Sequence, residues 1–158
     1  MGSESSDPII WTHYLQLMAY LSLFFSGFIA ATLFPASSEV LLLVLQAQGY
    51  SVLWLLVAAT AGNTLGSCVN WYLGTCLLDF QHKRWFPVSA TALSRAQLQF
   101  QRYGSWCLLL AWLPVVGDPL TLVAGVLKMR FRLFLPLVLL GKAARYALLL
   151  AAGSAWFA

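Results

Sequence analysis

Charged residues are scarce in this sequence. Of its 158 residues, 9% are Asp, Glu, Lys or Arg, whereas 61% are hydrophobic, and the mean hydropathy is +0.79. A soluble domain normally has about 25% charged residues, so the composition excludes an ordinary water-soluble domain. The length suits one membrane domain over residues 1–158 with no soluble module attached. We therefore interpret the chain as an integral membrane protein.

Motifs for enzymatic, cofactor and metal chemistry are also lacking. The three cysteines have no paired spacing and the two histidines are solitary, so we predict neither a disulfide nor a metal site. The sequence has no nucleotide-binding loop and no hydrolase motif. We therefore predict that the protein has no cofactor and no catalytic residue and is not an enzyme. The net charge of +4 does not indicate a nucleic-acid partner, because the cations cluster between apolar runs as membrane-flanking charges do.

The chain instead consists of two similarly punctuated halves. A shift of 79 residues places Pro35 on Pro114 and Glu39 on Asp118. The same shift matches two pairs of glycines, Gly62 with Gly141 and Gly74 with Gly153. Each half reads as an apolar run, a proline, an acidic residue four positions later, a short apolar run and a long apolar run. We interpret this pattern as an internal repeat, with repeat one at about residues 15–78 and repeat two at about residues 103–156.

The second half indicates the shape of a repeat. In "LPVVGDPLTLV" two prolines, a glycine and an aspartate interrupt a long apolar stretch, and only residues 120–127 separate this break from the next basic cluster. A spanning helix needs about 20 apolar residues. One kinked helix over residues 103–127 would place basic clusters on both sides of the bilayer, against the positive-inside rule. We therefore favour a re-entrant hairpin, whose irregular tip must be buried in protein or line a cavity.

The first half predicts a second hairpin, with its tip at residues 35–39. The interruption of the apolar sequence is weaker here, so a longer continuous helix is the alternative. The spanning helices are then residues 52–78 and 133–156. A hairpin followed by one span reverses sides once, so two tandem copies are inverted relative to each other. The predicted fold is therefore an all-α membrane protein of two inverted repeats, each a re-entrant hairpin plus a transmembrane helix.

The linker between the repeats, residues 79–102, carries four basic residues and is predicted to be cytoplasmic, with both termini on the opposite side. Its apolar residues recur at helical spacing and predict an amphipathic helix in the membrane interface; a solvated connector is the alternative. These residues are Leu93, Ala96, Phe100 and Tyr103.

Four ionisable residues lie deep in apolar sequence, namely Glu39, Asp118, Lys142 and Arg145. Lys142 lies about 14 Å along the last span, near the middle of a hydrocarbon core of about 30 Å. Charges at that depth are costly and indicate function, and Lys142 shares a helix face with Arg145. The second hairpin arms present free N–H groups near the same level, which favours an anion. The hairpin tips complete the predicted substrate-binding and coupling site: Pro35, Ser37, Ser38, Pro114, Gly117 and Pro119.

Structural roles explain the same charges in part. Asp118 is equally well explained as a helix N-cap before Pro119. Lys142 with Asp118, or Arg145 with Glu39, can form structural ion pairs, although burying such pairs seldom stabilises a fold more than apolar packing does. The asparagines at positions 63 and 70 face the same cavity only if their helix is suitably rotated, and we favour the interpretation that they are packing residues. The two acids and two cations sum to zero, so a bound phosphate would leave the site with a net negative charge unless a carboxylate takes up a proton. Coupling of transport to protons is therefore left open.

Four segments together resemble the DedA family of bacterial membrane proteins, also called VTT or SNARE-associated proteins, and especially its short YqaA-type branch. They are "FPASSEVLLL", "GNTLGSCVNWYLG", "RYGSWCLLLAWLPVVGDPLTLVAG" and "GKAARY". The resemblance, over residues 21–146, implies two inverted re-entrant hairpins that face each other and a flippase for phospholipid or polyprenyl-phosphate carriers, often coupled to the proton gradient. Glu39 matches the family's hairpin glutamate. The better-studied branch has arginines three residues before and after the second-hairpin proline, where this sequence has Ala111 and Gly117.

We therefore expect a multi-pass protein of the bacterial inner membrane that transports or flips an anionic lipid or polyprenyl-phosphate carrier. Its expected partners are membrane lipids, and homo-oligomers are left open. The alternatives are a small-ion or proton-coupled transporter and a non-transport structural factor whose charges lock the fold. A fourth alternative is an intramembrane enzyme acting on lipid phosphates, against which the missing His and Asp–Asp constellations argue.

Overall fold

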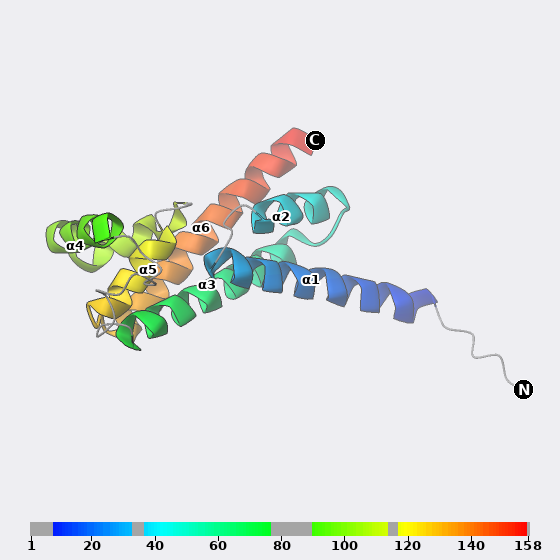
Figure 1. Cartoon of the computed structure of the whole chain (residues 1–158). Helices are drawn as coiled ribbons and strands as arrows, with labels where there is room; N and C mark the ends of the chain where they lie inside the picture. Colours follow the sequence, from blue (N-terminus) through cyan, green and yellow to red (C-terminus); the bar gives the residue numbers. More distant parts are fainter. Residues whose placement is uncertain (1–7, 33–36, 77–89, 114–116, 158) are drawn as a thin grey trace, which may run out of the picture.

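The computed structural model describes residues 8–32, 37–76, 90–113 and 117–157, and all regular structure in these ranges is helical (Figure 1). The predicted all-α class is therefore confirmed for this part of the chain. The elements are α1 (Pro8–Thr32), α2 (Ser37–Ala47), α3 (Val52–Cys76), α4 (Ala90–Tyr103), the 3-10 helix η2 (Gly104–Trp112), α5 (Gly117–Val126) and α6 (Phe131–Phe157).

Three of the described helices are long and apolar enough to cross a membrane, over Ile10–Ala31, Val52–Cys76 and Phe131–Trp156. The last two are α3 and α6, where spans at residues 52–78 and 133–156 were predicted. The first lies in α1, which occupies the place of the first arm of the predicted hairpin and is long enough to cross the membrane by itself. The sequence offers a reason, since no charge and no proline interrupts residues 9–32, so nothing local ends the helix earlier.

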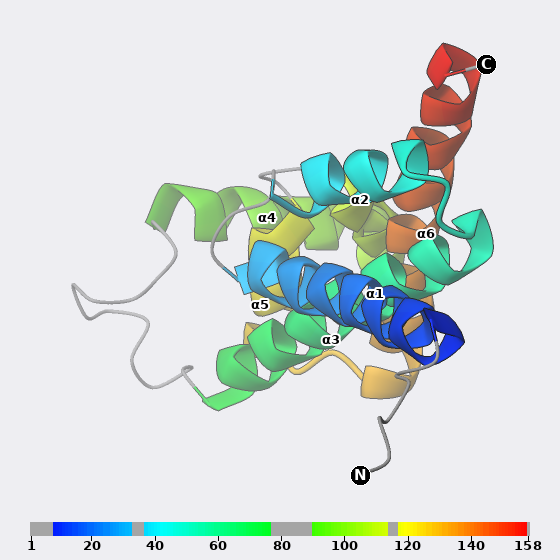
Figure 2. The same ribbon diagram turned by 90° about the vertical axis from the view of Figure 1, so that its right-hand side faces the viewer.

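Glycines allow the long helices to approach closely. α1 lies alongside α3 in both views (Figures 1 and 2), and a Cβ atom at Gly62 of α3 would collide with the carbonyl oxygen of Phe24 in α1. α3 in turn crosses α5 where Gly74 meets Gly125, and a Cβ atom on either glycine would collide with the backbone of the other helix. Small residues at helix crossings are the usual means by which helices pack in a membrane.

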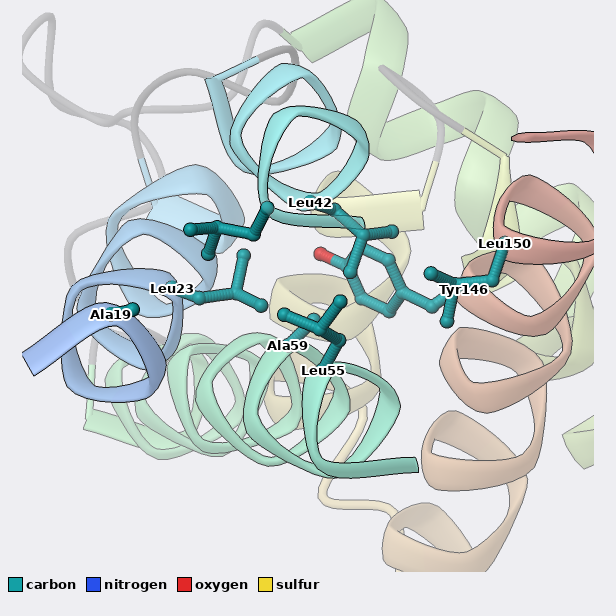
Figure 3. Packing of buried hydrophobic residues seen from close by; sticks show 8 residues of the cluster. Ala19, Leu23, Leu42, Leu55, Ala59, Tyr146 and Leu150 are labelled. Carbon is teal, nitrogen blue, oxygen red and sulfur yellow. The ribbon is translucent and has the colours of Figure 1, made fainter. Parts of the chain in front are cut away.

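Two apolar clusters hold the helices together. The first joins α1, α2, α3 and α6, and the Tyr146 ring reaches from α6 into its centre (Figure 3). Its buried members are Ala19, Leu23, Leu42, Leu45, Leu55, Ala59, Tyr146 and Leu150. The second joins η2, α5 and α6, and its buried members are Leu108, Leu120, Val123, Ala124, Phe134 and Val138. Both clusters use α6, which therefore connects the two halves of the molecule.

The short helices α2 and α5 end in the same way. Each is followed by a residue with positive φ, Gly49 at 84° and Lys128 at 51°, and these positions are 79 residues apart. The closing hydrogen bonds also correspond: Tyr50 N to Leu45 O is 3.2 Å and Met129 N to Ala124 O is 2.9 Å. This bond pattern is that of a Schellman motif. The next helices begin at Val52 and Phe131, so the same shift relates the ends of both short helices and the starts of both long ones.

The segment before α5 combines two kinds of helix. The helical spacing in the linker is confirmed as α4, which ends at Tyr103, whereas residues 79–89 lie outside the described ranges. The following apolar arm is a 3-10 helix from Gly104 to Trp112. Gly104 has a φ of 59°, a conformation that glycine adopts readily and that ends the α-helix before the arm begins.

Candidate functional site

The two acidic residues that lie deep in apolar sequence occupy equivalent positions, in the first turns of the two short helices. Glu39 is in the first turn of α2 and Asp118 in the first turn of α5. Because α5 begins at Gly117, Asp118 lies inside the helix rather than at the capping position considered from the sequence. A carboxylate in a first turn interacts favourably with the positive end of the helix dipole. Both acids therefore face a region that the backbone makes favourable for negative charge.

Lys142 of α6 forms the first ion pair. Its Nζ atom is 3.2 Å from Oδ1 of Asp118, and the lysine side chain is 2% exposed against 25% for the aspartate. The same ammonium group donates a hydrogen bond to Oδ1 of Asn63 in α3. Three helices, α3, α5 and α6, thus meet at one buried cation. Removing either acceptor would leave the ammonium short of a partner in an apolar environment, which is costly.

Arg145 forms the second ion pair, one helix turn further along α6. Its Nη2 atom donates to Oε1 of Glu39 in α2, with the arginine side chain 10% exposed and the glutamate 27% exposed. Both cations therefore come from one face of α6, as their spacing predicts, and each acid comes from a different short helix. In both pairs the carboxylate is the more exposed partner.

A chain of hydrogen bonds continues from the first pair toward the second. Nδ2 of Asn63 donates to the hydroxyl oxygen of Tyr146 at 2.8 Å. That oxygen is 3.0 Å from Oγ of Ser38, and either hydroxyl can be the donor. Ser38 is fully buried and Tyr146 is 1% exposed. Since Ser38 directly precedes Glu39 in α2, the polar contacts extend from Asp118 to the start of the other short helix.

The structure brings the four predicted charged residues together as two pairs, and the pairings are those considered from the sequence. Of the predicted tip residues, Ser38 joins the polar chain, whereas Gly117 is buried and Pro119 half-buried beside Asp118. The others lie outside the described residues: Pro35, Pro114 and the side chain of Ser37.

Sequence reasoning missed two members of the cluster, Asn63 and Tyr146. For Asn63 a packing role was favoured over a place in the cavity, although the 79-residue shift places it on Lys142, and that signal could have identified it. Tyr146 gave no separate signal, because a buried tyrosine in an apolar helix is indistinguishable from a packing aromatic. Asn70 does have the expected packing role, since its Nδ2 donates to the Ala31 carbonyl at 2.9 Å and so joins α3 to α1.

The arrangement suits binding of an anion rather than a metal. Within the described ranges, no three His, Cys, Asp or Glu side chains gather closely enough to hold a metal ion. Two cations converge beside the first turns of two helices. Cationic side chains and helix N-termini both donate hydrogen bonds to phosphate or carboxylate oxygens. An incoming anion would compete with the two resident carboxylates for these donors.

Comparisons with known proteins identify relatives over most of the chain. Residues 17–155 match the VTT domain. The chain is 39% identical over 148 residues to the inner membrane protein YqaA of Escherichia coli, covering 90% of this chain and 98% of that protein. It is 24% identical over 144 residues to undecaprenyl phosphate transporter A of Staphylococcus aureus, covering 84% of this chain and 71% of that protein. No solved structure matches the chain.

Proposed function

The chain belongs to the VTT domain family, also known as the DedA family, and from this premise we propose that it moves an anionic lipid phosphate across the membrane. A relative in Staphylococcus aureus is named for undecaprenyl phosphate transport, which favours a polyprenyl phosphate as the carrier. The name of the Escherichia coli relative favours the inner membrane as the location. The observation that carries the proposal is that Lys142 and Arg145, on one face of α6, reach the first turns of two short helices.

The short helices have the length of half-membrane arms. α2 has 11 residues and α5 has 10, which corresponds to about 15–17 Å at 1.5 Å per residue. The hydrocarbon core is about 30 Å thick, so neither helix can cross it. We assign both as the second arms of re-entrant hairpins whose tips lie near the middle of the membrane. The site residues Glu39 and Asp118 then lie at the same depth.

Two surface hollows support the return of each hairpin to its starting side. One is shared by the beginning of α1, including Gln16, and by Gly49 and Tyr50 of the turn after α2. The other is shared by the end of α4, including Phe100, and by Met129 of the turn after α5. In each half, the chain after the short helix is therefore close to the region where the hairpin starts. This supports an inverted pair of repeats, and the basic residues of the linker favour the cytoplasmic side for it by the positive-inside rule.

Charge balance suggests how a phosphate could be bound and released. The two acids and two cations sum to zero, and the carboxylates are the more exposed members. A phosphate arriving from the carboxylate side would take over donors from Lys142 and Arg145. Protonation of Glu39 or Asp118 would then restore neutrality, so proton uptake and lipid binding would favour each other. This is the basis of the proposed proton coupling.

Lipid binding by purified protein tests the proposal. Native mass spectrometry with added polyprenyl phosphate should detect a complex of the wild-type protein, and Lys142→Gln and Arg145→Gln should weaken it about tenfold or more, since a hydrogen bond to a charged group contributes about 1.5–3 kcal/mol. Arg132→Gln is the matched control, because Arg132 is exposed at the start of the same helix. Equal losses in all three variants, or no binding by wild type, would contradict the proposal. Ion flux without lipid binding would instead point to a small-ion transporter.

A further inference from the structure

The two ion pairs are joined by buried neutral groups that the sequence did not mark as functional. We propose that Asn63 and Tyr146 are positioning residues that couple the Asp118–Lys142 pair to the Glu39–Arg145 pair. The chain of contacts runs from Lys142 through Asn63, Tyr146 and Ser38 to the first turn of α2. The inference rests on the proposed function only for its consequence in transport, because the coupling itself is measurable without a lipid.

The orientation of the Asn63 amide is set by the lysine. An ammonium group has three donors and no acceptor, so Lys142 can only contact the oxygen of the amide, as it does. The amide nitrogen is thereby directed at Tyr146 and donates to its hydroxyl oxygen at 2.8 Å. Asparagine is the smallest side chain that offers one acceptor and two donors. Leucine at position 63 could satisfy neither neighbour, whereas aspartate could contact Tyr146 only by accepting the proton of its hydroxyl group.

Tyr146 transmits this arrangement to the other half of the molecule. Its ring is fixed among apolar side chains of four helices, including Leu42 and Leu55 (Figure 3). Its hydroxyl oxygen contacts both Asn63 and Ser38, at 2.8 Å and 3.0 Å. Since Tyr146 is 1% exposed, water has no access to replace a lost partner, and an unpaired buried polar group is costly.

A change at one ion pair therefore has a cost at the other. When Lys142 turns toward a ligand, Asn63 loses the contact that orients its amide, and Tyr146 loses a fixed donor. The Tyr146–Ser38 contact then weakens, and with it the position of the first turn of α2, where Glu39 binds Arg145. Such a connection would let the two halves change conformation together. Apolar packing alone would not link the two halves to whether an ion pair is formed or broken.

A double-mutant cycle on thermal stability tests the coupling in purified protein. Glu39→Gln opens one pair and Asp118→Asn opens the other. In the wild-type background, the Tm shift of the double variant should depart from the sum of the single shifts by about 2 °C or more. In a Tyr146→Phe background, which lacks only the hydroxyl group, the departure should vanish. Ser38→Ala breaks the same contact from its other side and should give the same result.

Tyr20→Phe is the matched control, because Tyr20 is a partly buried tyrosine that packs against the same apolar cluster. In that background the departure from additivity should remain. If Asp118→Asn does not fold, Lys142→Gln replaces it, since it opens the same pair. A merely structural role for Tyr146 would lower Tm equally in all members of the cycle and leave the departure intact, which would overturn the inference. Additive shifts in the wild-type background would overturn it as well.

These results are independent of lipid binding. If the cycle is non-additive but no anionic lipid binds, the coupling holds and the proposed function fails. If lipid binds and the cycle is additive, the proposed function holds and the coupling fails.

Discussion

Asn63 and Lys142 occupy equivalent positions in the two halves of the chain, 79 residues apart, and their side chains are hydrogen-bonded to each other. Their acids are equivalent too, since Asp118 lies 24 residues before Lys142 and Glu39 lies at the same interval before Asn63. The two halves differ in charge at this position, because the lysine of the second half is replaced by an asparagine in the first. Glu39 is consequently paired with Arg145 of α6. The site thus combines similar backbones with different side chains.

Removing the Asp118–Lys142 pair should separate binding from folding. Asp118→Leu should cost about 3–5 kcal/mol, because it leaves the buried lysine without a counter-charge. Lys142→Leu should cost less, since Asp118 is a quarter exposed and keeps access to solvent. The double variant should recover most of the stability, yet bind no anionic lipid. Thermal unfolding and lipid binding measured on the same samples check this; a double variant that is stable and still binds would make the pair a purely structural element.

The crossing of α3 and α5 should tolerate no side chain at Gly125. A Cβ atom there would collide with the Trp71 carbonyl oxygen, and overpacking of this kind costs about 1–3 kcal/mol. Gly141→Ala is the matched control, because the nearest atom to its Cβ, the Leu109 carbonyl oxygen, is at 3.2 Å. There the higher helix propensity of alanine, about 1 kcal/mol, should offset mild crowding. Tm should therefore fall for Gly125→Ala and stay nearly unchanged for Gly141→Ala; equal effects would contradict this crossing.

Cysteine labelling should place both basic regions on one side of the membrane. In a cysteine-free background, Ser94→Cys in α4 and Met129→Cys after α5 should both react with a membrane-impermeant reagent from the cytoplasmic side, and Ser5→Cys from the outside. The prediction rests on the hollow that the end of α4 shares with Met129 and on the positive-inside rule. Labelling of positions 94 and 129 from opposite sides would mean that η2 and α5 together cross the membrane.

The pH dependence of lipid binding should depend on the two acids. Binding of an anionic lipid by the wild-type protein should strengthen as the pH falls, because a protonated carboxylate no longer competes for Lys142 or Arg145. Glu39→Gln and Asp118→Asn should each bind lipid and show a flatter pH profile, because an amide cannot take up the proton. Binding titrations across pH values check this. Profiles as steep as that of the wild type in both variants would place the titrating group elsewhere.

Much of the fold could be predicted from the sequence because the signals are local. Long apolar runs identified α3 and α6, and the prolines near each acid indicated where the short helices begin. The length of α1 was left unspecified, because the predicted repeat defined only the hairpin tip that follows it. The 3-10 form of η2 could not be predicted, since its apolar sequence suits either kind of helix.

The site was only half predictable, for a physical reason. A charged residue in a membrane helix is conspicuous because its burial is costly, so Lys142 and Arg145 were found. Asn63 and Tyr146 are neutral, and a neutral side chain on a buried helix face serves packing as readily as function. The sequence therefore does not show which neutral residues on the inward face of a helix join the site. That face is determined by close crossings with other helices, such as those of α3 with α1 and α5 at its glycines.

Lipid movement in proteoliposomes tests the central claim most directly. The protein is reconstituted with a fluorescent anionic lipid phosphate, and a membrane-impermeant quencher reports how fast the lipid reaches the outer leaflet. The wild-type protein should accelerate movement of the anionic lipid but not of a zwitterionic lipid with the same chains. Arg145→Gln should abolish this acceleration, and Arg132→Gln should retain it. Movement that is no faster than in protein-free liposomes, or equally fast for both lipids and unaffected by Arg145→Gln, would contradict the assignment of this site.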